Sequence, residues 1–162
     1  MNDALQKAID SLLIQDIYLR SAESSLSDEF EPKYDANSDR LEVQFRHVVT
    51  HWSILALEQE GEDPVSLFRV FVDLGVRWLE PGTQGDDGDD ERVKARIAAT
   101  MVAEYQMSDD PGKESLKAFA LRNASYHIWP YWREYLMGQC LRMNLPKAIL
   151  PAVQFAQNRA SE

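Results

Sequence analysis

The residues with the most chemical potential in this chain are its three histidines and its single cysteine. His47 and His51 are four residues apart in a segment that alternates like a strand, so they could share one face of a sheet. A zinc or transition-metal site needs at least a third ligand, and we identify none in the sequence at a suitable spacing. We therefore expect ordinary surface or core histidines, and we predict no metal site.

His127 and Cys140 do not form a recognisable catalytic unit. His127 has no acidic or nucleophilic neighbour in the sequence that suggests a triad, although a triad is recognisable only in space. Cys140 is more typical of a small buried hydrophobic residue than of a nucleophile, and one cysteine excludes an intrachain disulfide. We predict no catalytic residue and no cofactor, so we do not expect an enzyme.

The run Asp86-Asp87-Gly88-Asp89-Asp90-Glu91 is the most acidic segment of the chain. It does not follow the pattern of an EF-hand calcium loop. Glycines among carboxylates are also unsuited to holding phosphate, because the local charge has the wrong sign. We expect a solvated loop over residues 80–92. Electrostatic docking of a basic partner is the alternative interpretation.

Length and composition indicate one globular domain over residues 1–162, with 44% hydrophobic and 10% aromatic residues. The net charge of -10 repels phosphate backbones and anionic lipid, which argues against nucleic-acid and membrane-surface binding. No apolar run approaches the roughly 20 residues that a membrane-spanning helix needs. The first residues also lack the features of a signal peptide, so we expect a cytoplasmic protein.

Alternation of apolar and polar residues predicts strands at residues 41–46, 68–78 and 93–105, and a weaker one at 15–21. The polar segment 24–39 between the first two strands is expected to be a crossover loop. Short connections between consecutive strands favour antiparallel pairing.

Helical spacing predicts a short helix within residues 1–14 and two more at 114–121 and 126–143. We expect Pro130 in the first turn of the long helix, where its missing N–H costs little. An extended apolar stretch, residues 148–155, is expected to follow. Strands first and helices second indicate the α+β class.

The long helix is apolar on more than one side. Trp129, Trp132 and Leu136 form one stripe, while residues such as Met137 and Leu141 lie on other faces. A sheet covers only one side of a helix, so a second copy of the chain is the economical cover for the other side. We predict a homo-oligomer, although packing within the core would also suit the aromatic residues. The predicted interface residues are Ile17, Trp129, Trp132, Tyr135 and Leu136.

Two motifs resemble the bacterial export chaperone SecB and its relatives. Trp129-Pro130-Tyr131-Trp132-Arg133-Glu134 is similar to that family's Phe-Pro-Tyr-x-Arg-Glu signature. The stretch from Pro146 to Phe155 is similar to its Pro-x-Leu-x-Leu-x-Pro-Val-Asn-Phe ending, with no gap between the two motifs. Ile17-Tyr18 matches the Ile-Tyr of the family's first strand. The resemblance covers roughly residues 12–156.

The resemblance implies a four-stranded antiparallel sheet packed on a long C-terminal helix, assembled as a dimer of dimers. It also implies an ATP-independent holdase that takes part in protein export. Such a protein binds unfolded polypeptides in apolar grooves between the crossover loop, the helix and the C-terminal stretch. The matching groove positions are Leu12, Phe30, Tyr34, Val153 and Phe155.

The chain departs from the family where partners are concerned. Family members that pass clients to the motor ATPase SecA carry acidic residues at the positions of Ser21 and Ser25. The tail after Phe155 is also short. These differences leave the motor partnership open. They favour, as an alternative function, a SecB-like protein that holds one specific partner, such as an antitoxin.

Overall fold

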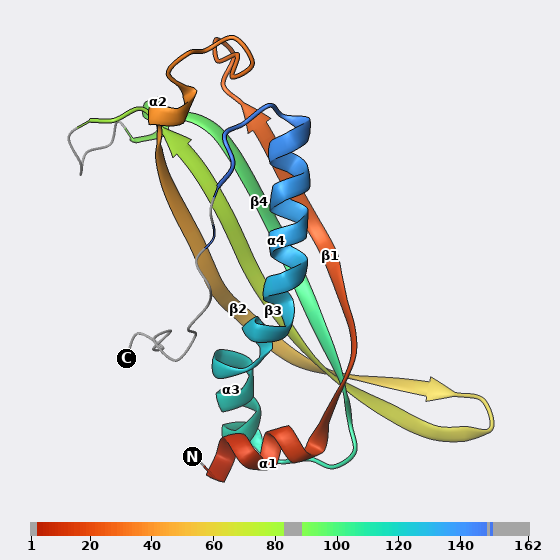
Figure 1. The fold of residues 1–162 in the computed structure, drawn as a ribbon. Coiled ribbons are helices and arrows are strands. Elements are labelled where there is room, and N and C mark those ends of the chain that lie inside the picture. The colour runs from red at the N-terminus through yellow and green to blue at the C-terminus, as the bar shows by residue number, and fades with distance from the viewer. Residues whose placement is uncertain (1–2, 83–88, 149, 151–162) are drawn as a thin grey trace.

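The computed structural model describes residues 3–82, 89–148 and 150, and it has the predicted α+β class (Figure 1). Along the chain its elements are α1 (Asp3–Ser11), β1 (Leu12–Leu26), a 3-10 turn (Ser38–Arg40), β2 (Glu42–Gln59), β3 (Glu62–Leu79), α2 (Asp89–Arg92), β4 (Val93–Met107), α3 (Lys113–Arg122) and α4 (Ala124–Arg142).

The four strands form one antiparallel sheet in the order β1-β4-β3-β2. β1 and β2 are longer than the sequence pattern predicted, because β1 includes residues 22–26 and β2 continues past Arg46 to Gln59. The reason is a set of register shifts, two in each of these strands. Each extra residue inverts the alternation of side chains between the two faces, so the period of two is lost from the sequence.

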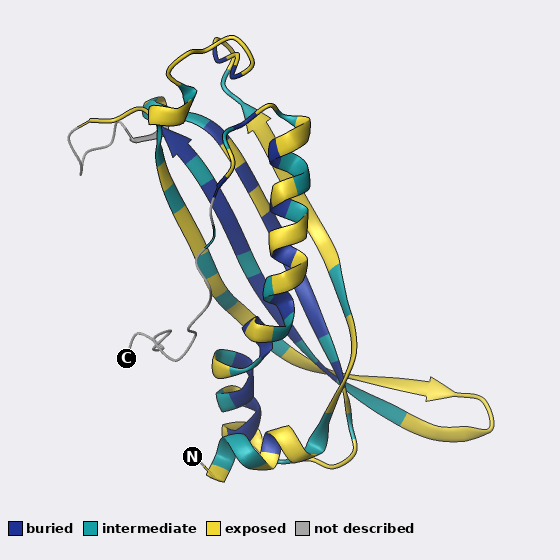
Figure 2. Cartoon of the chain, viewed as in Figure 1, coloured by how far each residue is buried: buried dark blue, intermediate teal, exposed yellow. Residues whose placement is uncertain are grey.

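The hydrophobic core lies between one face of the sheet and the helices α3 and α4 (Figure 2). The two central strands, β3 and β4, turn every second residue into this core, as their alternation predicted. α4 contributes buried residues at a spacing of four, which keeps them on one side of a helix. These five residues are Ala124, Ile128, Trp132, Leu136 and Cys140.

α4 packs mainly on β4, with fewer contacts to β1 and β3. The core-facing positions of β4 include Ala95, Ala99 and Ala103, all at most 5% exposed. These small side chains let the helix approach the strand closely, and the large residues of β3 fill the space beside it. Because α4 lies over β4, it does not cover β2.

α4 begins two residues earlier than predicted, so Pro130 lies in its second turn instead of its first. The proline therefore removes an intrahelical hydrogen bond, which is consistent with the bend of this helix. The helix ends at Arg142, and Asn144, two residues further on, adopts a left-handed conformation with a φ of 55°. The Leu145 N–H then donates to the Cys140 carbonyl at 2.9 Å, which completes a Schellman motif.

After this turn, residues 145–148 run back along the helix-covered side of the sheet (Figure 1). Leu145 and Ala148 are buried in the core, and Leu150 packs against it. Of the extended stretch predicted at residues 148–155, the structure describes Ala148 and Leu150, and the rest lies outside the described residues.

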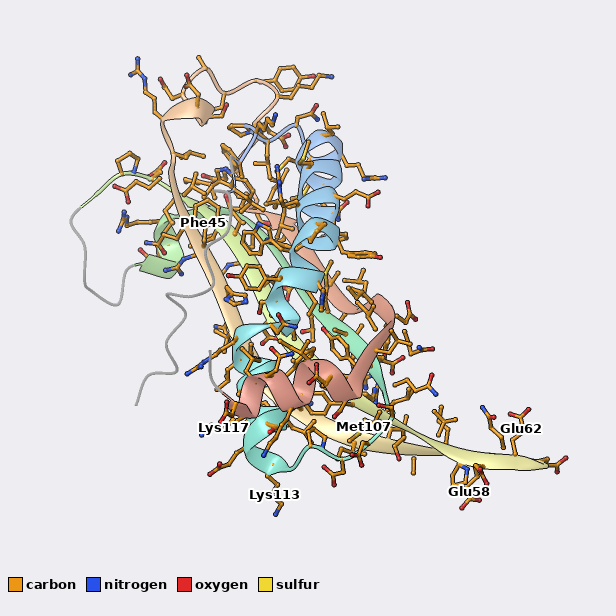
Figure 3. All side chains as sticks on the ribbon, turned by 60° about the horizontal axis from the view of Figure 1, so that its bottom comes forward. Phe45, Glu58, Glu62, Met107, Lys113 and Lys117 are labelled. Atoms are coloured by element: carbon orange, nitrogen blue, oxygen red, sulfur yellow. The ribbon has the colours of Figure 1, made fainter. Side chains whose placement is uncertain are left out.

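The outer half of the β2–β3 hairpin extends away from the helices (Figures 1 and 3). Its turn contains Gly61 with a φ of 78°, a conformation that favours glycine. Glu58 and Glu62 lie at its tip, far from Phe45 at the other end of β2 (Figure 3).

Candidate functional site

His47 and His51 do not share a face of the sheet, contrary to the prediction. The register shift between Val49 and His51 inserts one residue between them. His47 therefore faces the helices, where its Nε2 is 2.7 Å from the Ser125 hydroxyl. His51 faces the opposite side and stacks on Phe71, with ring centroids 4.0 Å apart.

The His47–Ser125 contact has the residue types of a base and a nucleophile. Ser125, however, is only 1% exposed, so a substrate carbonyl has no path to its hydroxyl. Burial lowers the pKa of His47 and keeps the imidazole neutral. We interpret the contact as a structural link between β2 and the first turn of α4.

His127 and Cys140 are also held in structural contacts. The Tyr105 hydroxyl lies 2.8 Å from Nδ1 of His127, and burial lowers the pKa of this histidine. Cys140 is buried, and burial raises the pKa of its thiol, which makes the thiolate nucleophile less available. Within the described residues, no three histidine, cysteine or acidic side chains gather as a metal site would require.

The acidic run at residues 86–91 lies partly outside the described residues. Its last residues, from Asp89, open the short helix α2. In the part of the chain that is described, no helix has the length and apolar character needed to cross a membrane.

The predicted groove residues lie in different places. Phe30 is 5% exposed and belongs to the core, under the crossover between β1 and β2. Tyr34 is in the same crossover and is 78% exposed. Leu12 is half-buried at the start of β1, about 45 Å along the strand from its other end. Val153 and Phe155 lie outside the described residues. The structure therefore brings together Phe30 and Tyr34 but leaves Leu12 apart from them.

Two of the predicted interface residues are core residues of the single chain. Trp132 and Leu136 are each 1% exposed, so their side chains have no surface left for a second protomer. Trp129 and Tyr135 are half-buried on α4, and Ile17 is half-buried on β1. Only these three retain surface that an oligomer could cover.

A row of exposed apolar residues follows β2 on the helix-covered side of the sheet. Val43, Phe45 and Ile54 are 38%, 52% and 52% exposed, and Trp52 between them is half-buried. Each pairs with a core residue of β3, which places all four on the side of the sheet that carries the helices. We call these four residues the β2 surface.

The β2 surface is exposed because of where the helices lie. α4 packs over β4, and only α3 reaches β2 among the major helix contacts. Sequence reasoning missed this surface, because alternation shows on which face of the sheet a side chain lies. It does not show whether a helix covers that side chain. Within the described residues β2 pairs only with β3, so its outer edge also presents main-chain N–H and C=O groups.

A second exposed apolar group lies on the outer side of α4. Tyr126, Met137 and Leu141 are 43%, 45% and 80% exposed. At 100° per residue they fall within about 60° of one another around the helix axis. We call these three residues the helix stripe. Its existence confirms that the sheet leaves apolar residues of this helix uncovered.

Comparison with known proteins identifies the fold. No protein-family model matches the sequence, and no curated protein matches it significantly. The structure is similar to that of a SecB-like chaperone, Rv1957 of Mycobacterium tuberculosis, solved in complex with a ChAD peptide from the Rv1956 HigA1 antitoxin. The TM-score is 0.63, and the match covers 94% of this chain and 98% of the other at 19% identity.

The match extends over nearly the whole length of both chains, so the chain has the SecB-like fold. The four-stranded antiparallel sheet packed on a long C-terminal helix, which the motifs implied, is confirmed. At 19% identity the similarity concerns the fold, and the function has to be argued from the surfaces of this chain.

Proposed function

We propose that this protein is an ATP-independent holdase that binds unfolded polypeptides on apolar surfaces of an oligomer. The observation that carries the proposal is the β2 surface, an apolar row beside a strand edge that pairs with no strand among the described residues, in a SecB-like fold. Apolar contact is non-directional, so one surface can accept many sequences. The strand edge can add main-chain hydrogen bonds to any extended segment.

The groove of this holdase combines the β2 surface with the sequence-derived positions. In this proposal Phe30, which is 5% exposed, would support the wall of the groove, and Tyr34, which is 78% exposed in the same crossover, would contact the client. Leu12 would serve a separate contact at the far end of β1. The positions Val153 and Phe155 are proposed on the motif alone.

We further propose that protomers associate as a dimer of dimers through the helix stripe, with Trp129 at its margin. Tyr135, on the β1 side of α4, and Ile17 on β1 would form a separate contact. Several copies of a weak client surface on one particle raise the apparent affinity through effective concentration. The net charge of -10 keeps such a particle soluble. Export of proteins from the cytoplasm is the cellular role that we propose for it.

A protein dedicated to one partner is the second candidate function. The observation that favours it is the similar structure itself, which was solved with a peptide from an antitoxin. The positions of Ser21 and Ser25 agree with it, because these uncharged residues stand where motor-coupled relatives carry acids. In that case a SecA-type motor is not a partner.

The first experiment follows aggregation of a chemically unfolded client by light scattering, with the protein at stoichiometric amount. We expect suppression without added nucleotide. The double variant Phe45→Ser/Ile54→Ser should lose most of it, because both side chains are about half exposed and can be changed without opening the core. The matched control is Ile9→Ser on α1, which is 39% exposed and lies away from β2. Unchanged aggregation with the wild-type protein would count against any holdase function.

A panel of unrelated unfolded proteins separates the two candidates. A general holdase slows the aggregation of most members, whereas a dedicated protein ignores most of them. Pull-down from the native cell extract is a second way to separate them. One dominant partner would favour the dedicated protein, and many clients would favour the general holdase.

A further inference from the structure

The two edge strands of the sheet each contain a bulge at the same level. Arg20 is an inserted residue in β1, and Thr50 is an inserted residue in β2. By register both insertions adjoin the same residue of β3, Val72. A bulge bends its strand and redirects side chains, so bulges often occur beside functional sites. Two of them at one level therefore mark this part of the sheet for closer inspection.

A hollow of about 850 Å³ lies between the two bulges, on the face of the sheet opposite the helices. The central strands contribute three of its residues, which alternate with core residues and so point away from the helices. The edge strands contribute the two inserted residues and one neighbour of each. Its volume is within the range of about 300–1,000 Å³ that is usual for small-molecule sites. We call these seven residues, Arg20, Ser21, Thr50, His51, Phe71, Asp73 and Thr100, the outer hollow.

The outer hollow contains one positive and one negative group that do not pair with each other. The Arg20 guanidinium lies over the Phe71 ring, 5.8 Å from its centroid, and forms no ion pair among the described residues. Asp73 accepts a hydrogen bond from the Thr100 hydroxyl at 2.7 Å. Its ion pair with Arg46, outside the hollow, is long at 3.8 Å, and its side chain is 33% exposed. Both charged groups are therefore accessible to a ligand.

An aromatic pair and free hydroxyl capacity lie beside these charges. The His51 ring stacks on Phe71, with centroids 4.0 Å apart and an angle of 14° between the planes. Phe71 is only 6% exposed although it faces away from the helices, because His51 and Arg20 cover it. The Thr50 hydroxyl donates to the Phe71 carbonyl at 3.2 Å, so its oxygen keeps acceptor capacity.

We propose that the outer hollow binds a free aromatic α-amino acid in its zwitterionic form. The carboxylate of the ligand pairs with the Arg20 guanidinium, whose planar fork suits bidentate binding. The ammonium group of the ligand donates to the Asp73 carboxylate. The aromatic side chain of the ligand packs beside the stacked rings of His51 and Phe71.

The separation of the two charged groups favours a zwitterion over a simple ion. Phe71 and Asp73 are two residues apart on β3, about 7 Å along the strand, and Arg20 lies over Phe71. An α-amino acid with a charge-assisted hydrogen bond of about 2.8 Å at each end spans roughly 8 Å. An anion without an ammonium group would meet the repulsion of Asp73, and a cation without a carboxylate would meet that of Arg20.

The test is a saturation-transfer NMR titration of the full chain with L-phenylalanine. We expect saturable binding. N-acetyl-L-phenylalanine retains only the carboxylate and L-phenylalaninamide retains only the ammonium group. Each should bind at least about tenfold more weakly than L-phenylalanine, because each leaves one charged group of the hollow without its partner.

Variants assign the two ends of the ligand. Arg20→Gln and Asp73→Asn should each weaken L-phenylalanine binding by about tenfold. Arg20→Gln should also remove the preference for L-phenylalanine over its amide, because the two differ only at the carboxylate. The matched controls Arg142→Gln and Asp16→Asn remove the same charges from exposed positions outside the hollow, and each should change binding by less than about twofold.

A further variant keeps both charges in place. Ser21→Leu fills the hollow from an exposed position on β1, and it should weaken L-phenylalanine binding by a similar factor. Thermal melting of each variant checks that the fold is retained. None of these changes alters a residue of the β2 surface, so client aggregation assays should give the wild-type result and test the holdase proposal separately.

Three results would overturn this inference. The first is wild-type protein that does not bind L-phenylalanine, or that binds either singly charged analogue equally well. The second is an equal loss of binding in the test variants and the matched controls. The third is a fall in particle mass for Arg20→Gln, which would place this residue in a contact between protomers.

Discussion

Replacing Leu141 by alanine should dissociate the proposed oligomer while leaving the protomer folded. Leu141 is 80% exposed on the outer side of α4, so the single chain gains almost nothing from its side chain. A surface change of this kind alters protomer stability by about 0.5 kcal/mol or less. In an oligomer that buries the helix stripe, the apolar area of the same side chain contributes to the free energy of association.

The size of the effect follows from that exposure. Burying a complete leucine side chain contributes about 1.5–3 kcal/mol. With 80% available and a methyl group retained by alanine, each protomer loses about 1–2 kcal/mol. A twofold interface contains the residue twice, so dissociation becomes easier by about 2–4 kcal/mol, or roughly 30- to 1,000-fold in Kd.

The assay is sedimentation or light scattering over a concentration series. Wild-type protein should exceed the protomer mass of 18.6 kDa at micromolar concentration, and Leu141→Ala should approach that mass. The control is Leu57→Ala on the projecting hairpin, an exposed leucine away from α4, which should leave the mass unchanged. A wild-type mass of 18.6 kDa at every concentration, or equal masses for both variants, would refute the reasoning.

Three further outcomes test the fold and its assembly. Gly138→Ala should stabilise an isolated protomer by about 1 kcal/mol in urea unfolding, because its Cβ would meet only the mobile end of Arg142, 2.7 Å away. If a second backbone packs there, the same change should weaken association instead, and no change in either quantity would contradict both readings. Trp132→Ala should cost about 3–5 kcal/mol in the same unfolding assay, since Trp132 is 1% exposed between α4 and the sheet, and a loss below about 1 kcal/mol would disprove that position. Burial lowers the pKa of His47 and His127 below the unfolded value of 6.5, so the unfolded chain binds more protons and stability should fall as pH drops from about 7.5 to about 5.5. His47→Gln and His127→Asn should each flatten that dependence, whereas a wild-type slope for both variants would exclude this cause.

The central strands and the long helix were predictable because their patterns are local. The alternation from Phe68 to Trp78 survives because β3 pairs with β4 without a shift over that stretch, until Leu79. The stripe containing Trp132 and Leu136 repeats with the period of a helix, so its core-facing side was visible in the sequence. β1 and β2 were underestimated because an inserted residue in a strand leaves no local mark on composition.

The sequence by itself therefore determined the α+β class, the elements of the core and the motifs that resemble SecB. Only the tertiary structure decided that His47 and His51 face opposite sides of the sheet. It also decided that Trp132 points into the core while Leu141 points out, and that α4 packs over β4 and not over β2. The same packing brought Arg20 and Asp73 into one hollow from different strands. The physical reason is that the period of the apolar residues and the propensity for a helix or strand are set by residues close together in the sequence. Which apolar residues remain exposed depends on how elements distant in sequence pack against one another.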